Sequence, residues 1–131
     1  MDRLLIVCAG GAVGSGARYL VTLGAAAAFG TTFPYGTLIV NVSGCFLISL
    51  IMHVAAAIAL PAKIQLLVTT GFLGGLTTFS TFDYETTSLL EEHAFKTGIL
   101  NIGITVVACI IATLLGLFLA RVLVGSSSMG T

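Results

Sequence analysis

Polar side chains recur at helical spacing in three stretches of the chain that are otherwise apolar. Asn41 stands between two valines, and its carboxamide offers two donors and an acceptor without formal charge. The other two stretches carry one-sided stripes, which are Thr77, Thr81 and Glu85, and Asn101, Thr105, Cys109 and Thr113. Such groups are costly against lipid, so three stripes favour one shared solvated path. Taken alone, Asn41 slightly favours an interhelical hydrogen bond, and the hydroxyls could bond back to their own helices.

Two phenylalanines beside these stripes add a second kind of chemistry. Phe79 and Phe82 lie three positions apart and therefore project from the same turn of a helix. An aromatic ring has a positive edge that can meet an anion without a fixed opposite charge. Neutral donors and ring edges can replace the hydration of a small anion and still release it, whereas a buried cation would hold it. The alternative is that both rings are plain core residues.

Residues 71–82, GFLGGLTTFSTF, predict an interruption inside a membrane helix. Each of the three glycines costs about 1 kcal/mol relative to alanine in a helix interior. Unwound backbone is tolerated at membrane depth only where protein or a water-filled cavity receives its polar groups. We therefore expect a break near 73–78 that faces a partner or a pore.

The overall composition defines an integral membrane protein. The chain has 131 residues, of which 57% are hydrophobic and 8% charged, and its mean hydropathy is +1.15. The zero net charge gives no basis for nucleic-acid binding, and without nucleotide motifs, a catalytic triad or paired carboxylates we expect no enzyme. Cys8, Cys45 and Cys109 lie in apolar runs and are expected as free thiols that pack as small hydrophobes.

Four segments are long enough to cross a bilayer, which needs roughly 20 helical residues. The predicted helices are 4–29, 37–60, 63–90 with the break inside it, and 95–124. The N-terminal helix is too long for the apolar region of a signal peptide, so we expect it to be retained. The prediction is a single transmembrane channel domain over 1–131, in which 125–131 form a flexible tail.

Charge placement gives only a weak orientation signal. Arg3, Lys63 and Arg121 would share one side of the membrane, with Lys96 on the other, which favours cytoplasmic termini. A bias this small also permits insertion both ways up, and hence an antiparallel dimer. Arg18 lies inside the first helix and is expected to reach the interface by snorkelling.

Small residues mark faces suited to close helix packing. Gly10 and Gly14 form a GxxxG motif in the first helix, and a small-residue seam follows the last helix at Ala108, Ala112, Gly116 and Ala120. Packing within the chain and packing between subunits are both open readings of these motifs.

Three sequence blocks resemble the signature blocks of the Fluc (CrcB) fluoride channel family. They are GGAVGSGARY at 10–19, GTLIVNVSG at 36–44 and GFLGGLTTFSTF at 71–82, in order and on the expected helices. The resemblance implies an all-α, antiparallel dual-topology homodimer in the bacterial inner membrane, with two fluoride pathways. It further implies passive export of fluoride that confers resistance, a central structural sodium ion and no organic cofactor.

The resemblance also assigns roles to residues in the blocks, to Glu85 just after the third block and to Thr113 as a pore hydroxyl of the last helix. The residues implied for the fluoride pore are Asn41, Phe79, Phe82, Ser80, Thr81, Glu85, Thr113 and Thr37. Backbone carbonyls of Gly74 and Thr77 are implied as the sodium ligands. Structural roles fall to Gly10, Gly14, Arg18 and Gly75. Asp83 lies outside the motif, and its role stays open.

Two other functions are compatible with four short helices. A small dual-topology multidrug or cation antiporter normally needs a carboxylate deep in the first helix to exchange protons, and 4–29 contains none. A structural membrane protein without transport is the other alternative, and the broken third helix argues against it.

Overall fold

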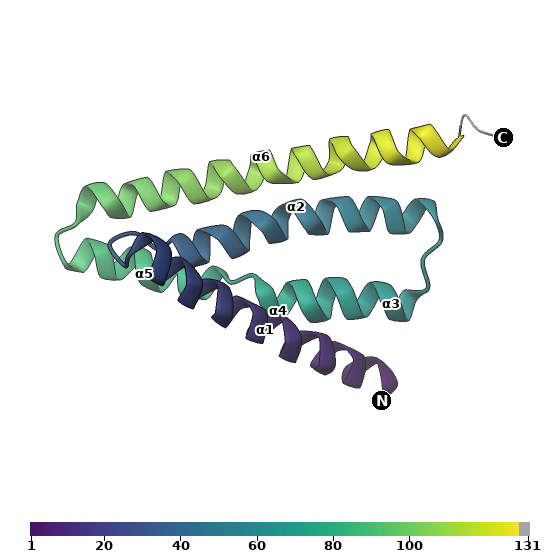
Figure 1. The fold of residues 1–131 in the computed structure, drawn as a ribbon, viewed down its shortest axis with the longest axis horizontal. Helices are drawn as coiled ribbons and strands as arrows, with labels where there is room; N and C mark the ends of the chain where they lie inside the picture. The colour runs from purple at the N-terminus through teal and green to yellow at the C-terminus, as the bar shows by residue number, and fades with distance from the viewer. Residues whose placement is uncertain (129–131) are drawn as a thin grey trace.

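The computed structural model describes residues 1–128, and all of its regular elements are helical (Figure 1). In chain order the elements are α1 (Asp2–Phe29), α2 (Tyr35–Ala57), α3 (Ala62–Leu66), η1 (Leu67–Leu73), α4 (Gly74–Leu76), α5 (Phe79–Glu91) and α6 (Phe95–Ser128). The predicted all-α architecture is confirmed.

Three of the helices, α1, α2 and α6, are long and apolar enough to cross a membrane. The remaining apolar segment, 62–91, is divided into α3, η1, α4 and α5, and none of these pieces alone reaches spanning length. Helix α6 continues to Ser128, beyond its predicted end at 124, because serine and glycine weaken a helix without ending it. The rest of the predicted tail, 129–131, lies outside the described residues.

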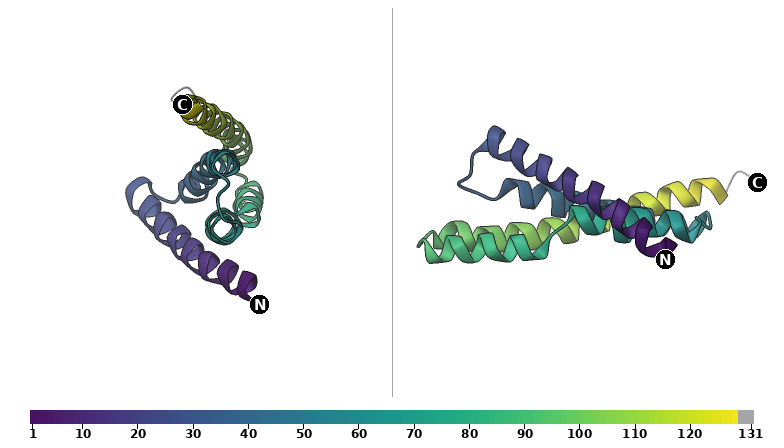
Figure 2. Two further views of the ribbon diagram at one scale, coloured as in Figure 1. Left: turned by 90° about the vertical axis from the view of Figure 1, so that its right-hand side faces the viewer. Right: turned by 90° about the horizontal axis from the view of Figure 1, so that it is seen from below.

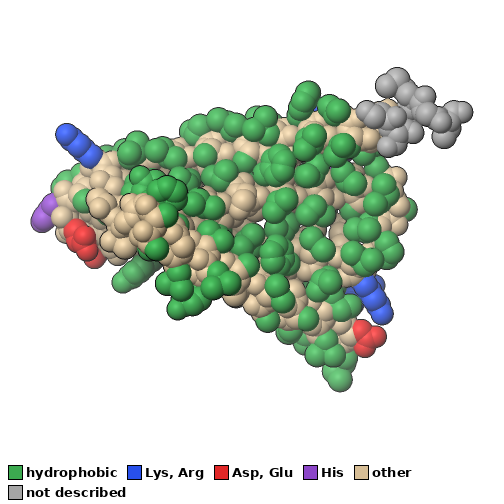
Figure 3. Space-filling model, in the orientation of Figure 1, with side chains coloured by type: hydrophobic (Ala, Val, Ile, Leu, Met, Phe, Trp, Pro, Cys, Tyr) green, Lys and Arg blue, Asp and Glu red, His purple; other side chains and the backbone are tan. Residues whose placement is uncertain are grey.

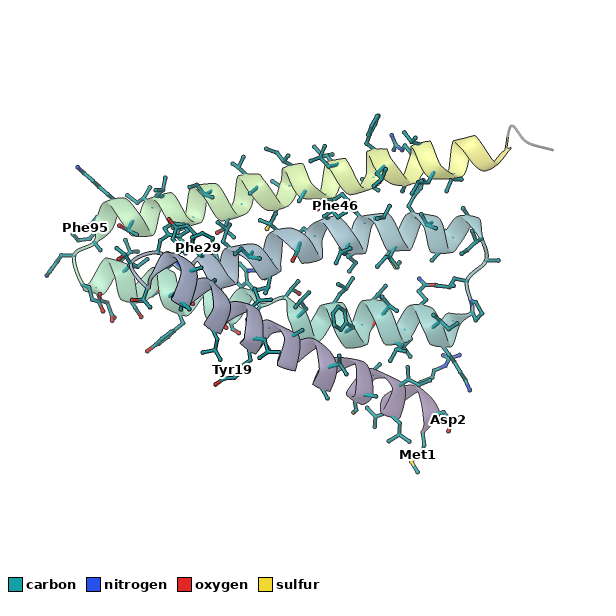
Figure 4. The ribbon with its side chains drawn as sticks, in the orientation of Figure 1. Met1, Asp2, Tyr19, Phe29, Phe46 and Phe95 are labelled. Atoms are coloured by element: carbon teal, nitrogen blue, oxygen red, sulfur yellow. The ribbon has the colours of Figure 1, made fainter. Side chains whose placement is uncertain are left out.

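Charged side chains gather at the two ends of the molecule, and apolar side chains cover the length between them (Figure 3). Met1 and Asp2 lie at the opposite end of the molecule from Phe29 and Phe95, while Tyr19 projects outward from α1 (Figure 4). At the N-terminal end, Lys63 Nζ lies 3.9 Å from a carboxylate oxygen of Asp2. The start of α1 and the start of α3 therefore share one end.

Helix α1 crosses the first half of the interrupted segment at an incline (Figure 2). The crossing is glycine on glycine: a Cβ on Gly10 would lie 2.9 Å from Gly71 Cα, and one on Gly75 would lie 2.6 Å from the Gly11 carbonyl oxygen. A Cβ on Gly14 would collide with the Phe72 carbonyl. The GxxxG motif thus packs within the chain, where close approach lets dispersion act between backbones.

Helix α6 packs most extensively on α2. Ala112, Gly116 and Ala120 of the predicted seam are buried, and Ala108 is half-buried. A Cβ on Gly116 would collide with the Phe46 carbonyl and the Ser49 hydroxyl, so this glycine sets how closely the two helices approach. The seam therefore also serves packing within the chain.

The interrupted segment leaves helical geometry at Thr77 and Thr78, inside the stretch where the break is predicted. Thr77 has φ −83° and ψ 157°, and Thr78 has φ −156° and ψ 121°, which are extended conformations. The glycines do not unwind: Gly71 lies in the π-helical η1, and Gly74 and Gly75 form the α4 turn. The expectation that glycines make the break is wrong at this level of detail, because Gly71 and Gly75 are used for contact with α1.

Candidate functional site

The break is held open by the side chain of Asn41, which reaches it from α2. Asn41 Oδ1 accepts a hydrogen bond of 2.8 Å from the Thr78 backbone N–H, and Asn41 Nδ2 donates one of 2.9 Å to the Thr78 carbonyl. A carboxamide presents a donor and an acceptor side by side, so it can bond to both the N–H and the carbonyl of one residue. One Nδ2 hydrogen remains for a further acceptor.

Thr78 begins α5 and gathers the hydroxyl groups at its start. Its Oγ1 accepts a 3.2 Å hydrogen bond from the Thr81 N–H, as an N-cap residue does. The same oxygen lies 3.0 Å from Thr81 Oγ1 and 3.3 Å from Ser80 Oγ. Three hydroxyls and the positive end of the α5 dipole therefore meet at the break.

An open cavity of about 460 Å³ lies against the break and collects residues from the three stretches singled out in the sequence. Its walls include Asn41 and Cys45 of α2, Gly74, Thr77, Thr78, Phe79 and Phe82 of the interrupted segment, and Thr105 and Cys109 of α6. All three stretches contribute to this cavity, but it is not lined by Ser80, Thr81, Glu85, Asn101 or Thr113.

The two phenylalanines differ strongly in exposure. Phe82 is 8% exposed and packs in the protein, whereas Phe79 is 77% exposed. Their ring centroids are 5.6 Å apart and the planes are tilted by 50°, so the edge of one ring approaches the other. Phe82 is fixed by its surroundings, and Phe79 is presented at the open side of the cavity.

Glu85 and Thr37 form a separate polar contact further along α5. The Glu85 carboxyl interacts with the Thr37 hydroxyl, and its Oε2 is buried with no hydrogen-bond partner among the described residues. Neither residue lines the 460 Å³ cavity. Asp83 directly follows Phe82 and is exposed.

The residues of the stripe predicted on α6 do not all face one place, although Thr105 donates a 3.3 Å hydrogen bond to Asn101 Oδ1. Asn101, 1% exposed, donates a 2.9 Å hydrogen bond to Thr86 Oγ1, which itself donates to the Phe82 carbonyl at 2.7 Å. Thr105 and Cys109 line the cavity, while Thr113 lines a different cavity of about 410 Å³ together with His53 and Ser49. The sequence analysis missed Thr86. Its place four residues after Phe82 permits its hydrogen bond to the Phe82 carbonyl.

Two carbonyls at the break lose the donors that a continuous helix would give them. The donor for Gly74 would be the Thr78 N–H, which binds Asn41 instead. The donor for Thr77 would be the Thr81 N–H, which binds the Thr78 hydroxyl. Neutral carbonyl oxygens are suitable ligands for a hard cation. Within residues 1–128 there is no cluster of three or more His, Cys, Asp or Glu side chains that could hold a metal ion.

The remaining assigned residues lie on α1 and α4. Arg18 is half-buried on α1, one turn from the buried Gly14. Gly10, Gly14 and Gly75 shape the crossing of α1 over the interrupted segment. Gly14 and Gly75 therefore lie close before the break, and none of the four residues lines the 460 Å³ cavity.

Long apolar helices, together with a helix interrupted beside an open cavity, define an integral, multi-pass membrane protein. The chain belongs to the CrcB family: the family model described as CrcB-like protein, Camphor Resistance (CrcB), matches residues 5–117. The expected family membership is confirmed.

Curated relatives cover nearly the whole chain. It is 46% identical over 124 residues to the fluoride-specific ion channel FluC of Citrifermentans bemidjiense, covering 94% of this chain and all of the relative. It is 48% identical over 122 residues to the protein of the same name from Geobacter sulfurreducens, covering 92% and 98%. A relative of that name from Anaeromyxobacter is 46% identical over 126 residues, covering 95% and 100%. These relatives are named as channels, not as enzymes.

Proposed function

We propose that this protein is a fluoride-selective channel that lets fluoride leave the cytoplasm passively. The observation that carries the proposal is the break clamped by Asn41, which places neutral donors and the Phe79–Phe82 pair around one open cavity. The relatives of this chain, named fluoride-specific ion channels, support the same substrate.

Fluoride is small and strongly hydrated, so its pathway has to offer several donors at once. The free Nδ2 hydrogen of Asn41, the hydroxyls of Ser80 and Thr81 and the edge of Phe79 are such donors, and all are neutral. In this proposal Thr37 and Glu85 lie further along the path on the α5 side, and Thr113 lies at its other end in the second cavity.

No energy source other than the membrane potential is required. Hydrogen fluoride enters cells as a neutral acid and ionises inside, after which an inside-negative potential of 100 mV drives each fluoride outward by roughly 2.3 kcal/mol. Export through a channel of this kind in the inner membrane would confer fluoride resistance.

We infer that the working unit is an antiparallel homodimer. The cavity is open on one side, and Phe79 stands there 77% exposed, which leaves the pathway without a second wall in a single chain. Lys63 lies beside Asp2 at one end of the molecule, and Lys96 follows Phe95 at the other end (Figure 4). The small charge difference between the ends supports insertion in both orientations. A second copy running the other way would close each cavity and give two pathways.

We also propose a structural sodium ion at the centre of this dimer, and the same break supports it. The carbonyls of Gly74 and Thr77, deprived of their helical donors, would supply two ligands from each chain. When bound, the ion would hold the two breaks together electrostatically. The chain itself contributes the preformed geometry, because Asn41 and the Thr78 cap keep the two carbonyls free of helical bonds.

Measurement of fluoride efflux from liposomes tests this function against its alternatives. Liposomes that contain the purified protein should release fluoride, detected by a fluoride electrode. Release should require a potassium ionophore, because potassium must leave with fluoride to balance the charge. A proton-coupled antiporter would instead move a cationic dye when a pH gradient is imposed, and a structural protein would do neither. The antiporter alternative has little support in the fold, since the only acidic residue of α1 is Asp2 in its first turn.

A further inference from the structure

Two cysteines from different helices meet in the wall of the cavity. Cys45 belongs to α2 and Cys109 to α6, and both line the 460 Å³ cavity with Asn41 and Phe82. The two thiols are near enough to each other to interact electrostatically. Both are free thiols, and each is partly accessible.

The packing of α2 against α6 fixes this pair. Gly116 lets α6 approach the Phe46 carbonyl and the Ser49 hydroxyl, one helical turn beyond Cys45. Close-packed helices of this kind cannot separate locally without loss of many small contacts. This packing keeps both cysteines on the wall of one cavity, where a single bound ion could reach both sulfur atoms.

The chemistry of the pair limits what it can bind. Sulfur ligands select soft metal ions over hard ones. No third His, Cys, Asp or Glu side chain completes a cluster in the described part of the chain, which disfavours the four-ligand sites typical of zinc. A soft ion satisfied by two ligands fits the geometry.

Charge selects further among soft ions. Coordination deprotonates a thiol, so a divalent ion M²⁺ and two thiols give a neutral S–M–S bridge and two released protons. The cavity wall is largely apolar, and a neutral complex avoids the penalty that a buried net charge would carry. A monovalent soft ion would leave one negative charge there.

We propose that Cys45 and Cys109 form a binding site for a soft divalent metal ion of two-coordinate preference, with Hg²⁺ as its probe, and that occupancy of this site obstructs the ion pathway. The second half of the inference rests on the proposed channel function, because the same cavity holds Asn41 and Phe82. The first half concerns binding alone.

Native mass spectrometry of the purified full-length protein tests binding without any flux. Incubation with Hg²⁺ followed by a monothiol wash should leave one metal on each chain, at a mass that corresponds to one mercury gained and two protons lost. Cys45→Ala and Cys109→Ala should each weaken Hg²⁺ binding by at least about tenfold. Changes to residues that only support metal ligands already lower affinity by about that factor. The matched control is Cys8→Ala, which removes an exposed thiol on α1 and should bind as the wild type does.

A protection experiment on the wild-type chain avoids reliance on variants that fail to fold. Hg²⁺ should protect Cys45 and Cys109 together from maleimide, mapped by peptide mass spectrometry, while Cys8 stays reactive. Equal labelling of Cys45 and Cys109 with and without Hg²⁺ would overturn the site, as would tight binding that requires Cys8.

Fluoride efflux from liposomes then tests obstruction. Hg²⁺ should inhibit efflux by the wild type and by Cys8→Ala, and a dithiol should restore it. Cys45→Ala and Cys109→Ala should resist inhibition. The flux of each protein is compared with its own flux before treatment. Metal binding through both cysteines without inhibition would refute the obstruction. Absence of any fluoride flux with intact binding would refute the channel and leave the dithiol site standing.

Discussion

The Asn41 carboxamide is hydrogen-bonded to the backbone of Thr78 on both sides, at 2.8 Å to the N–H and 2.9 Å to the carbonyl. The bond to the N–H stands in place of the helical bond to the Gly74 carbonyl, which the extended Thr78 does not make. The side chain expected from the sequence to line a pore is thus also what keeps the third segment interrupted. Substitution of Asn41 should therefore affect structure and ion flux together.

Asn41→Asp should abolish most fluoride efflux and also lower thermal stability. The carboxylate can accept from the Thr78 N–H, but it cannot donate to the Thr78 carbonyl, and it adds a negative charge on the proposed path of the anion. Loss of the donor to a buried carbonyl costs about 1–3 kcal/mol. Liposome efflux and thermal unfolding in detergent measure the two effects. The control is Ser43→Ala, because the Ser43 hydroxyl bonds only within its own helix. Normal efflux in Asn41→Asp would contradict the proposed path.

Phe79→Ile should reduce fluoride efflux with little change in stability. The ring is largely exposed, so its loss removes a positive edge from the cavity and few packing contacts. Phe82→Ile should reduce both fluoride efflux and stability. The loss of stability should be smaller than the roughly 3–5 kcal/mol typical of a Phe to Ala change in a core. Near-normal efflux in both variants, compared with Tyr19→Ile on the outer face of α1, would rule out a role for the rings.

Gly75→Ala should destabilise the protein, while Gly16→Ala should not. A Cβ at Gly75 would lie 2.6 Å from the Gly11 carbonyl oxygen, and one at Gly16 would have no neighbour within 4 Å. Overpacking of this kind costs about 1–3 kcal/mol, whereas the exposed glycine changes stability by no more than about 1 kcal/mol through helix propensity. Thermal unfolding in detergent compares the two directly. Equal effects would show that the α1 crossing is looser than the geometry indicates.

Insertion in both orientations predicts mixed accessibility of the two ends. Lys63→Cys and Lys96→Cys, each in a chain without Cys8, Cys45 and Cys109, should both be partly labelled by an impermeant maleimide added to whole cells. The reason is the small charge difference between the ends, which gives little preference for one orientation. Complete labelling of one position and complete protection of the other would exclude the antiparallel dimer.

Replacement of sodium by a bulky organic cation should lower both the melting temperature and the fluoride flux, and sodium should restore them. Thr77→Ala should keep this dependence, because the proposed ligand is its carbonyl and its hydroxyl bonds only to the Leu73 carbonyl. Gly75→Val should lose it through distortion of the adjacent turn. Full stability and flux in exhaustively sodium-free protein, with no ion at the break in an experimental structure, would remove the sodium from the proposal.

The sequence by itself determined the membrane class, the four apolar segments, the stretch that contains the break and some of the residues that line the cavity, such as Asn41, Phe79 and Phe82. Composition and apolar run length decide these features locally, since a bilayer accepts only long apolar helices. The small-residue motifs were also visible, because glycine and alanine at four-residue spacing permit close packing in any arrangement.

Only the tertiary structure decided what each of these residues contacts. The glycines of 71–75 pack against α1 and remain helical, and the break falls at Thr77 and Thr78 because Asn41, 37 positions away, takes the Thr78 N–H. Thr113 faces a different cavity from Thr105, and Cys45 meets Cys109, only because α2 and α6 pack in one register. Spacing along a helix fixes which residues share a face, but the partner of that face depends on long-range packing that no local pattern encodes.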